Sequence, residues 1–168
     1  MAFIMLVTIS CKGDKKAETS AEPDSKTEVV EEEVVKEELT TKVSTDGTLE
    51  IAGDDAMMFD KKELKVKAGQ KVTLTLTHVG KMGLNIMGHN WVLLKQGTYV
   101  AKFADKAIEA GPDKGYLPEE DSIIASTKLI GGGESVTITF DAPAAGTYDF
   151  ICSFPGHYGI MQGKFIVE

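Results

Sequence analysis

The chain has 168 residues, a formal net charge of −8 and a hydrophobic fraction of 42%, which allow one globular domain with a terminal extension. All 18 positive side chains are lysines. Because arginine is the preferred partner of phosphate groups, the lack of arginine argues against a nucleic-acid-binding protein. The acidic excess lies largely in residues 12–50, so the rest of the chain is closer to neutral.

Residues 1–11 are mostly apolar and end at Ser10-Cys11. The run is shorter than the about 20 residues that span a bilayer. It resembles the end of a bacterial lipoprotein signal, in which a small residue precedes a cysteine that becomes lipidated. No lysine or arginine precedes the run, and Thr8 stands where leucine is usual, so an ordinary cleaved export signal is the alternative. Both interpretations predict a location outside the cytoplasm, in the periplasm or cell envelope.

Residues 12–47 are dominated by Glu, Lys, Ser and Thr and contain no aromatic side chain. Such a segment buries too little apolar surface to offset the entropy lost on ordering, which predicts a flexible acidic linker. The alternative is a short helix with one apolar side, formed by Val29, Val30, Val34, Val35 and Leu39. Without a partner, a helix of that length is marginal.

From residue 48 onward, hydrophobic and polar residues alternate with a period of two, which is typical of strands with one buried face. Strands are expected at residues 64–66 and 72–76, and again at 91–94, 123–129, 135–140, 147–152 and 163–167. Alanine-rich residues 98–110 predict one short helix, which Gly111-Pro112 ends. Seven or eight short strands with one helical insertion predict an all-β Greek-key sandwich over residues 48–168.

The loop between the last two expected strands carries Cys152, His157 and Met161. A thiolate, an imidazole and a thioether together favour copper that cycles between Cu(I) and Cu(II). A type 1 site needs a second histidine, and His89, just before a buried strand, is the natural candidate. Each residue taken alone has a plainer explanation as a core or gap-filling side chain. An unpaired Cys152 in an exported protein is unusual, however, and a bound metal would explain it.

Two segments resemble the copper motifs of the azurins, which are bacterial cupredoxins: MGHNWVL at 87–93 and CSFPGHYGIMQG at 152–163. Thr77-His78 and residues 126–134 also match, and the resemblance covers about residues 48–168. Azurins carry a disulfide near the start of the domain, whereas no cysteine lies between Cys11 and Cys152 here. That difference affects the packing of the first strand rather than the copper site.

The resemblance implies one type 1 copper, with His89, Cys152 and His157 as equatorial ligands and Met161 as a weak axial ligand. It also implies a distant contact to the Gly88 carbonyl, a cross-link between the ligand loops through Asn90, and backbone N–H groups near Phe154 that tune the thiolate. His78 would be a buried non-ligand. We interpret it as a core histidine bonded to the backbone, and a proton switch is the alternative.

The predicted function is outer-sphere transfer of single electrons between redox partners such as c-type cytochromes and reductases. We expect electrons to pass through an apolar surface around His157, which we call the electron-transfer patch. Its members are Met82, Met87, Phe154, Pro155, Tyr158 and Ile160.

Three other functions compete with electron transfer. A copper enzyme needs a second metal with further histidines, and only three histidines are present. A dinuclear copper domain needs two cysteines in the loop, where this chain has one. A periplasmic copper carrier or storage protein remains as the alternative, although a buried thiolate would release copper slowly.

Overall fold

The computed structural model describes residues 42–168. The expected signal segment, 1–11, and residues 12–41 of the expected linker lie outside the described residues. Within residues 42–168, no helix combines the length and the apolar character needed to cross a bilayer.

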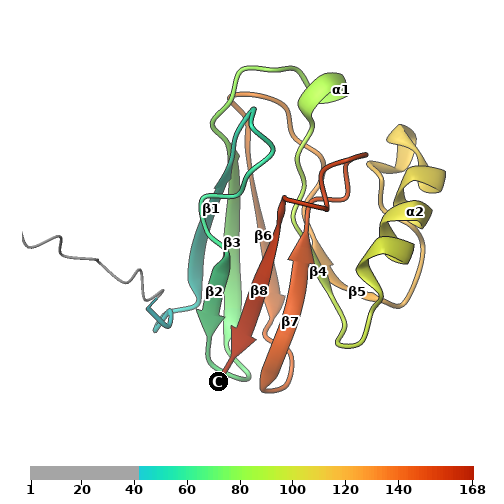
Figure 1. Ribbon diagram of the computed structural model, residues 1–168. Helices are drawn as coiled ribbons and strands as arrows, with labels where there is room; N and C mark the ends of the chain where they lie inside the picture. The colour runs from blue at the N-terminus through green and yellow to red at the C-terminus, as the bar shows by residue number, and fades with distance from the viewer. Residues whose placement is uncertain (1–41) are drawn as a thin grey trace, which may run out of the picture. The chain divides into compact units, whose positions relative to one another are not determined.

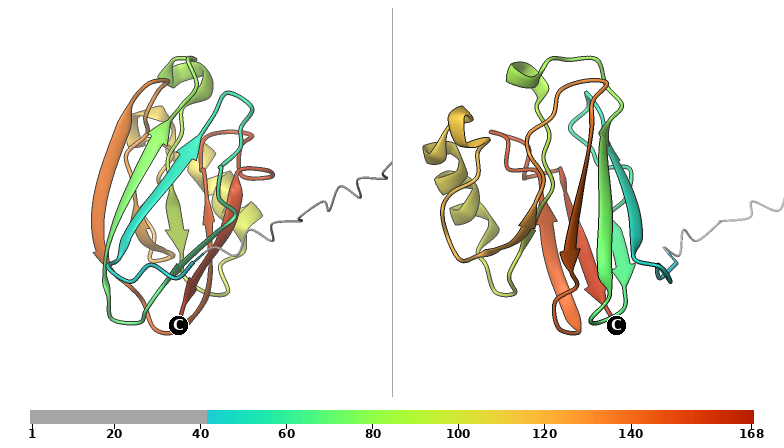
Figure 2. Two further views of the ribbon diagram at one scale, coloured as in Figure 1. Left: turned by 90° about the vertical axis from the view of Figure 1, so that its left-hand side faces the viewer. Right: turned by 180° about the vertical axis from the view of Figure 1, so that it is seen from behind.

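The described residues form two β-sheets that face each other (Figures 1 and 2). The strands are β1 (Thr48–Gly53), β2 (Glu63–Val66), β3 (Lys71–His78), β4 (Val92–Leu94), β5 (Ile123–Ser126), β6 (Ser135–Asp141), β7 (Gly146–Ile151) and β8 (Gln162–Val167). The first sheet has the order β1-β3-β6, and the second has the order β2-β8-β7-β4-β5. The pairs β1–β3 and β2–β8 are parallel, and the remaining neighbours are antiparallel.

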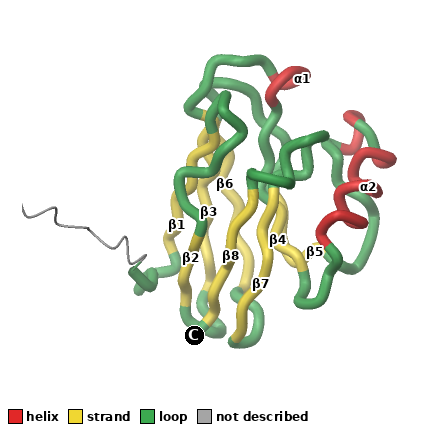
Figure 3. Tube along the Cα trace, in the orientation of Figure 1, coloured by secondary structure: helices red, strands yellow, loops and turns green. Residues whose placement is uncertain are grey.

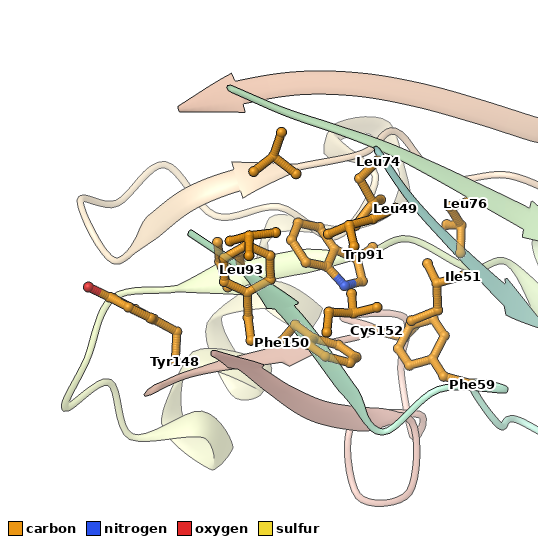
Figure 4. Packing of buried hydrophobic residues seen from close by; sticks show 14 of the residues in the cluster. Leu49, Ile51, Phe59, Leu74, Leu76, Trp91, Leu93, Tyr148, Phe150 and Cys152 are labelled. Atoms are coloured by element: carbon orange, nitrogen blue, oxygen red, sulfur yellow. The ribbon is translucent and has the colours of Figure 1, made fainter. Parts of the chain in front are cut away.

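The alternation in the sequence explains which faces are buried. In β3, every second side chain from Val72 to His78 is buried, and the threonines between them are partly exposed. Trp91 lies in the core beside Phe150 (Figure 4). Its ring also packs against the rings of Phe140 and Phe165. Burial of this apolar surface between the sheets is the main stabilising term of the sandwich.

The predicted all-β sandwich is confirmed, with small differences at the ends of elements. The expected helix is α2 (Val100–Ala110), and Gly111, with φ 77°, follows its last residue. The strand expected at 123–129 ends at Ser126. Thr127 still pairs with Trp91: its N–H donates to the Trp91 carbonyl, and its Oγ1 accepts the N–H of Trp91. The structure adds α1 (Leu84–Met87) and a 3₁₀ turn, η1 (Pro112–Lys114). These are too short to show a helical period in the sequence.

The segment that precedes β1 is attached to the domain. The backbone N–H of Ser44 donates to the Lys65 carbonyl, and the N–H of Thr73 donates to the Gly47 carbonyl. These bonds hold the start of the first strand. No disulfide contributes to this, because Cys152 is a free cysteine and residues 42–168 contain no disulfide.

The loops that matter for function meet at one end of the sandwich. The connections after β1, after β3 and after β7 all lie at the end where α1 is seen (Figure 3). The helix α2 covers the side of the second sheet near β4 and β5 (Figure 1).

Candidate metal centre

Three of the predicted ligand residues meet at this end of the sandwich. Cys152 Sγ lies 3.6 Å from His157 Nδ1 and 4.0 Å from His89 Nδ1. The three side chains are buried, and their potential ligand atoms lie within 4.8 Å of one another. In the described part of the chain, this is the one group of three or more His, Cys, Asp or Glu side chains close enough to share a metal ion.

The ligand loop is closed by its own backbone. The N–H of Cys152, just after β7, donates to the Met161 carbonyl, just before β8. Inside the loop, the His157 carbonyl accepts the N–H groups of Ile160 and Met161, and the N–H of His157 donates to Phe154. Gly156 adopts φ 82°, which favours glycine. The loop therefore holds its three side chains in a compact turn.

His89 reaches the same point from a different part of the sheet. It precedes β4, and its N–H and carbonyl both pair with Ile130 at 2.9 Å. Its ring Nε2 lies 2.9 Å from the Asp54 carbonyl, so Nε2 carries the proton and donates it to that oxygen. Nδ1 is then left with a free lone pair directed at the cysteine side. A backbone carbonyl thus sets the tautomer that metal binding requires.

His78 belongs to the core and takes no part in the cluster. Its Nδ1 accepts the N–H of Gly80 at 3.0 Å, and its Nε2 donates to the Met87 carbonyl at 2.7 Å. The ring stacks on His89 with centroids 4.1 Å apart. Both ring nitrogens are therefore occupied by backbone groups, as expected for a core histidine.

Burial sets the protonation of the three side chains. Burial raises the pKa of the Cys152 thiol to about 12, although the backbone N–H groups of Asn90 and Phe154 act in the opposite direction. Burial lowers the pKa of His157 to about 4 and also lowers the pKa of His89. At neutral pH the imidazoles are uncharged and ready to bind a metal. The thiolate, by contrast, needs a cation to be stable in this environment.

Asn90 joins the segments that carry His89 and Cys152. Its Oδ1 accepts the backbone N–H of Ser153 at 2.8 Å, and its Nδ2 donates to Ser153 Oγ at 2.8 Å and to the Gly115 carbonyl at 3.1 Å. Ser153 Oγ in turn donates to the Tyr116 carbonyl. The residue after His89 and the residue after Cys152 are thereby held in one buried network that extends to the turn after α2.

Two glycines beside the cluster have no room for a side chain. A Cβ at Gly53 would lie 2.6 Å from Met161 Cε and 2.9 Å from His89 Cδ2, so only glycine fits at the end of β1. The Gly88 carbonyl lies 3.9 Å from Cys152 Sγ, which places it beside the cluster. A Cβ at Gly88 would come within 2.6 Å of the Leu84 carbonyl oxygen.

These donors fit a copper ion. Metal bonds to nitrogen and sulfur of about 2.0–2.3 Å would keep three ligands around one ion roughly 3.5–3.7 Å apart. The Cys152–His157 separation of 3.6 Å lies in this range, and the Cys152–His89 separation of 4.0 Å is slightly longer. A set of two imidazoles and one thiolate, with a buried thioether nearby, is the type 1 copper arrangement. All four side chains are buried: His89, Cys152, His157 and Met161. Their burial excludes water from the position that a metal would occupy.

Comparisons with known proteins agree with this geometry. A profile of the family described as copper binding proteins, plastocyanin/azurin family, matches residues 45–168. The chain belongs to the plastocyanin/azurin family. It is 47% identical over 121 residues to azurin-1 of Alcaligenes xylosoxydans xylosoxydans, covering 69% of this chain and 93% of that protein. It is 46% identical over 124 residues to auracyanin-A of Chloroflexus aurantiacus, covering 72% and 74% of the two chains.

A solved structure of a related protein has the same fold. The reduced auracyanin of Roseiflexus castenholzii superposes with a TM-score of 0.67 at 43% identity, covering 73% of this chain and 97% of that chain. As a member of the plastocyanin/azurin family, the protein is a blue copper electron carrier with one type 1 copper, and not an enzyme. Its partners are other redox proteins, and azurins are in general periplasmic or extracellular.

Some residues that shape the site carried no signal in the sequence. Asp54 acts through its backbone carbonyl, which no side-chain pattern reveals. Ser153 could have been noticed as a polar residue beside the cysteine, and Gly53 as a glycine at the end of a strand. Lys62, whose Nζ donates to the Ile160 carbonyl at 2.8 Å, lies 98 residues from its partner. Such contacts depend on the tertiary structure alone.

Proposed function

We propose that His89 Nδ1, Cys152 Sγ and His157 Nδ1 would hold the copper, with the Met161 thioether as a fourth, weaker ligand. The Gly88 carbonyl would be a further, more distant contact of the metal. The observation that carries this assignment is the buried Cys152 thiol, which lies between two neutral imidazoles and requires a cation to ionise. The Met161 side chain supports the role of a fourth ligand because it is fully buried and its Cε lies beside the Gly53 backbone.

The protein's contribution to electron transfer is a site that does not have to rearrange. When bound, copper supplies one-electron chemistry by cycling between Cu(I) and Cu(II). The Asp54 carbonyl holds the orientation of the His89 ring, and Asn90 holds the two ligand segments together. The Cys152–Met161 backbone bond fixes the ends of the loop. Because these bonds are made within the protein itself, few atoms need to move as the charge changes.

We also propose that electrons enter and leave through the electron-transfer patch. Met82 and Ile160 are 43% and 50% exposed, whereas Met87, Pro155 and Tyr158 are half-buried and Phe154 is buried. Leu84 and Ile86 in α1 add further exposed apolar surface at this end. Exposed apolar patches of this kind mark surfaces that bind partners.

His157 supports this port because it is the least buried of the four proposed ligands: it is 2% exposed, whereas His89, Cys152 and Met161 are 0% exposed. The Nε2 of His157 has no hydrogen-bond partner among the described residues. In residues 42–168, the one fully buried side-chain nitrogen or oxygen without a hydrogen-bond partner is Trp91 Nε1. His157 Nε2, which also has no partner, is therefore not fully buried. A trace of the His157 edge therefore remains at the surface. Met82→Lys should slow electron exchange with redox partners and leave the optical spectrum unchanged; equal exchange rates would contradict this port.

We propose c-type cytochromes or a reductase as the redox partners, and a location in the periplasm or cell envelope. The proposed organisation is a lipoprotein-like signal segment (1–11), an acidic linker (12–47) and the copper domain (48–168). A lipid anchor at Cys11 would then hold the domain near a membrane. The test is membrane fractionation of the full chain and of Cys11→Ser. Release of the variant supports the anchor, and equal partitioning refutes it.

The ligand assignment is tested by the absorption spectrum of the oxidised, copper-loaded protein. An intense blue thiolate-to-copper band is expected, and it should disappear in Cys152→Ala. Survival of the band in that variant would refute the assignment. Rapid loss of copper to a weak chelator would favour the alternative function, a copper carrier or storage protein.

A further inference from the structure

The connection between β1 and β2 touches both the copper site and the electron-transfer patch. Within it, the Asp54 carbonyl accepts the proton of His89 Nε2, as described above. The Asp54 carboxylate accepts the N–H groups of Ala56 and Met58 at 3.0 and 3.2 Å, which closes the turn on itself. This short segment is therefore rigid and fixed to a ligand ring.

The next residue, Asp55, turns its carboxylate toward a different loop. Oδ2 accepts the backbone N–H of Lys81 at 2.8 Å, and Oδ1 accepts the N–H of Met82 at 3.2 Å. A Cβ on Gly80 would lie 2.1 Å from Asp55 Oδ1, so the carboxylate lies directly against the backbone of that glycine. Asp55 thus contacts three consecutive residues, 80–82, which are 25 to 27 positions away in the sequence.

The bonds made by Asp55 are those of an ionised carboxylate. The pKa of Asp55 is lowered, and the largest cause is the hydrogen bond from the backbone N–H of Lys81. A charge-assisted bond of this type is stronger than a neutral one. Oδ1 also lies 3.9 Å from Nε2 of His78, whose ring stacks on His89. A negative charge is therefore held close to the histidine pair at the copper site.

We propose that Asp55 is a positioning residue for electron transfer: its carboxylate holds the Gly80–Met82 backbone so that the exposed Met82 keeps a fixed place relative to the copper ligand His89. This inference rests on the electron-transfer patch proposed above. The physical reason is that Asp54 and Asp55 are adjacent in one turn. The Asp54 backbone carbonyl holds the ligand His89, and the Asp55 side chain holds the loop that carries the patch residue Met82. No other side chain in residues 42–168 bonds the N–H groups of Lys81 and Met82.

The test compares Asp55→Asn with Asp60→Asn in the full chain. An asparagine at 55 has one acceptor oxygen and would turn an NH₂ group toward one of the two N–H groups. Asp60 is the matched control, because it lies in the same connection and loses the same charge. Its carboxylate accepts the N–H of Ala52 in β1 instead of the patch loop. Asp55→Glu is the second variant, which keeps the charge and restores part of the bonding if Asp55→Asn folds poorly.

Three measurements are made on each variant. Amide hydrogen exchange of Lys81 and Met82 in the metal-free protein should accelerate by about tenfold or more in Asp55→Asn alone. Electron self-exchange between copies of the copper-loaded protein, measured by NMR line broadening, should slow. The reduction potential should rise, because loss of a nearby negative charge favours Cu(I), and a change in folding stability alone would not produce that rise.

Amide exchange at these positions that is no faster in Asp55→Asn than in Asp60→Asn would overturn the proposal. Faster amide exchange with unchanged self-exchange and potential would also overturn it, because Asp55 would then be only structural. A failure of the electron-transfer patch can be distinguished from a failure of the Asp55 proposal. If the patch is wrong, Met82→Lys leaves the self-exchange rate unchanged, whatever the amide exchange of the Asp55 variants shows.

Discussion

Replacement of Asn90 by leucine is the sharpest test of how the site is built. The two side chains have the same number of heavy atoms and the same branching, so the change removes the polar atoms and keeps the connectivity of the side chain. It breaks the bonds from Asn90 to the N–H and Oγ of Ser153 and to the Gly115 carbonyl. The N–H of Ser153 is left in a buried position, which costs about 2 kcal/mol, and the partly exposed Gly115 carbonyl adds about 1 kcal/mol. The expected loss of unfolding free energy is about 3 kcal/mol.

The assay is urea denaturation of the metal-free protein at pH 7, followed by the fluorescence of the single tryptophan. Ser153→Ala is the control: it removes the hydroxyl but keeps the backbone bond to Asn90, so a smaller loss of about 1 kcal/mol is expected. The copper-loaded Asn90→Leu protein should also release copper faster to a chelator, because its two ligand segments are no longer joined. A loss below about 1 kcal/mol for Asn90→Leu would refute the reasoning.

Three further predictions concern protons, space and solvent. Copper(II) uptake at pH 7 should release about one proton, since the Cys152 thiol has a pKa of about 12 and both imidazoles are already neutral. As the pH falls through about 4, His157 becomes protonated, so proton release should rise and copper affinity should fall, as titration with a pH indicator would show. Gly53→Ala should destabilise the metal-free protein by about 1–3 kcal/mol and alter the copper spectrum, because its Cβ would overlap the His89 ring; an unchanged denaturation midpoint would contradict this. Trp91, fully buried with no partner for Nε1, should emit at unusually short wavelength and resist quenching by iodide; emission typical of exposed indole would be inconsistent with the core described.

The sequence by itself was enough to find the fold class and the metal. The period of two in β3 places Val72, Leu74 and Leu76 on one face because neighbouring side chains in a strand point to opposite sides. The cluster of Cys152, His157 and Met161 could be recognised because three soft or borderline donors lie within ten residues. For such local patterns, spacing along the chain translates directly into position in space.

The tertiary structure alone decided how the site is held. The bond from His89 to the Asp54 carbonyl joins residues 35 positions apart, and Asp55 reaches Met82 across 27 positions. The fit of Gly53 against Met161 is of the same kind. A backbone carbonyl or the absence of a Cβ gives a sequence pattern nothing to detect. These groups become functional only when the packing of two sheets brings the ends of β1, β3 and β7 together, because sheet pairing, not distance along the chain, sets which loops meet.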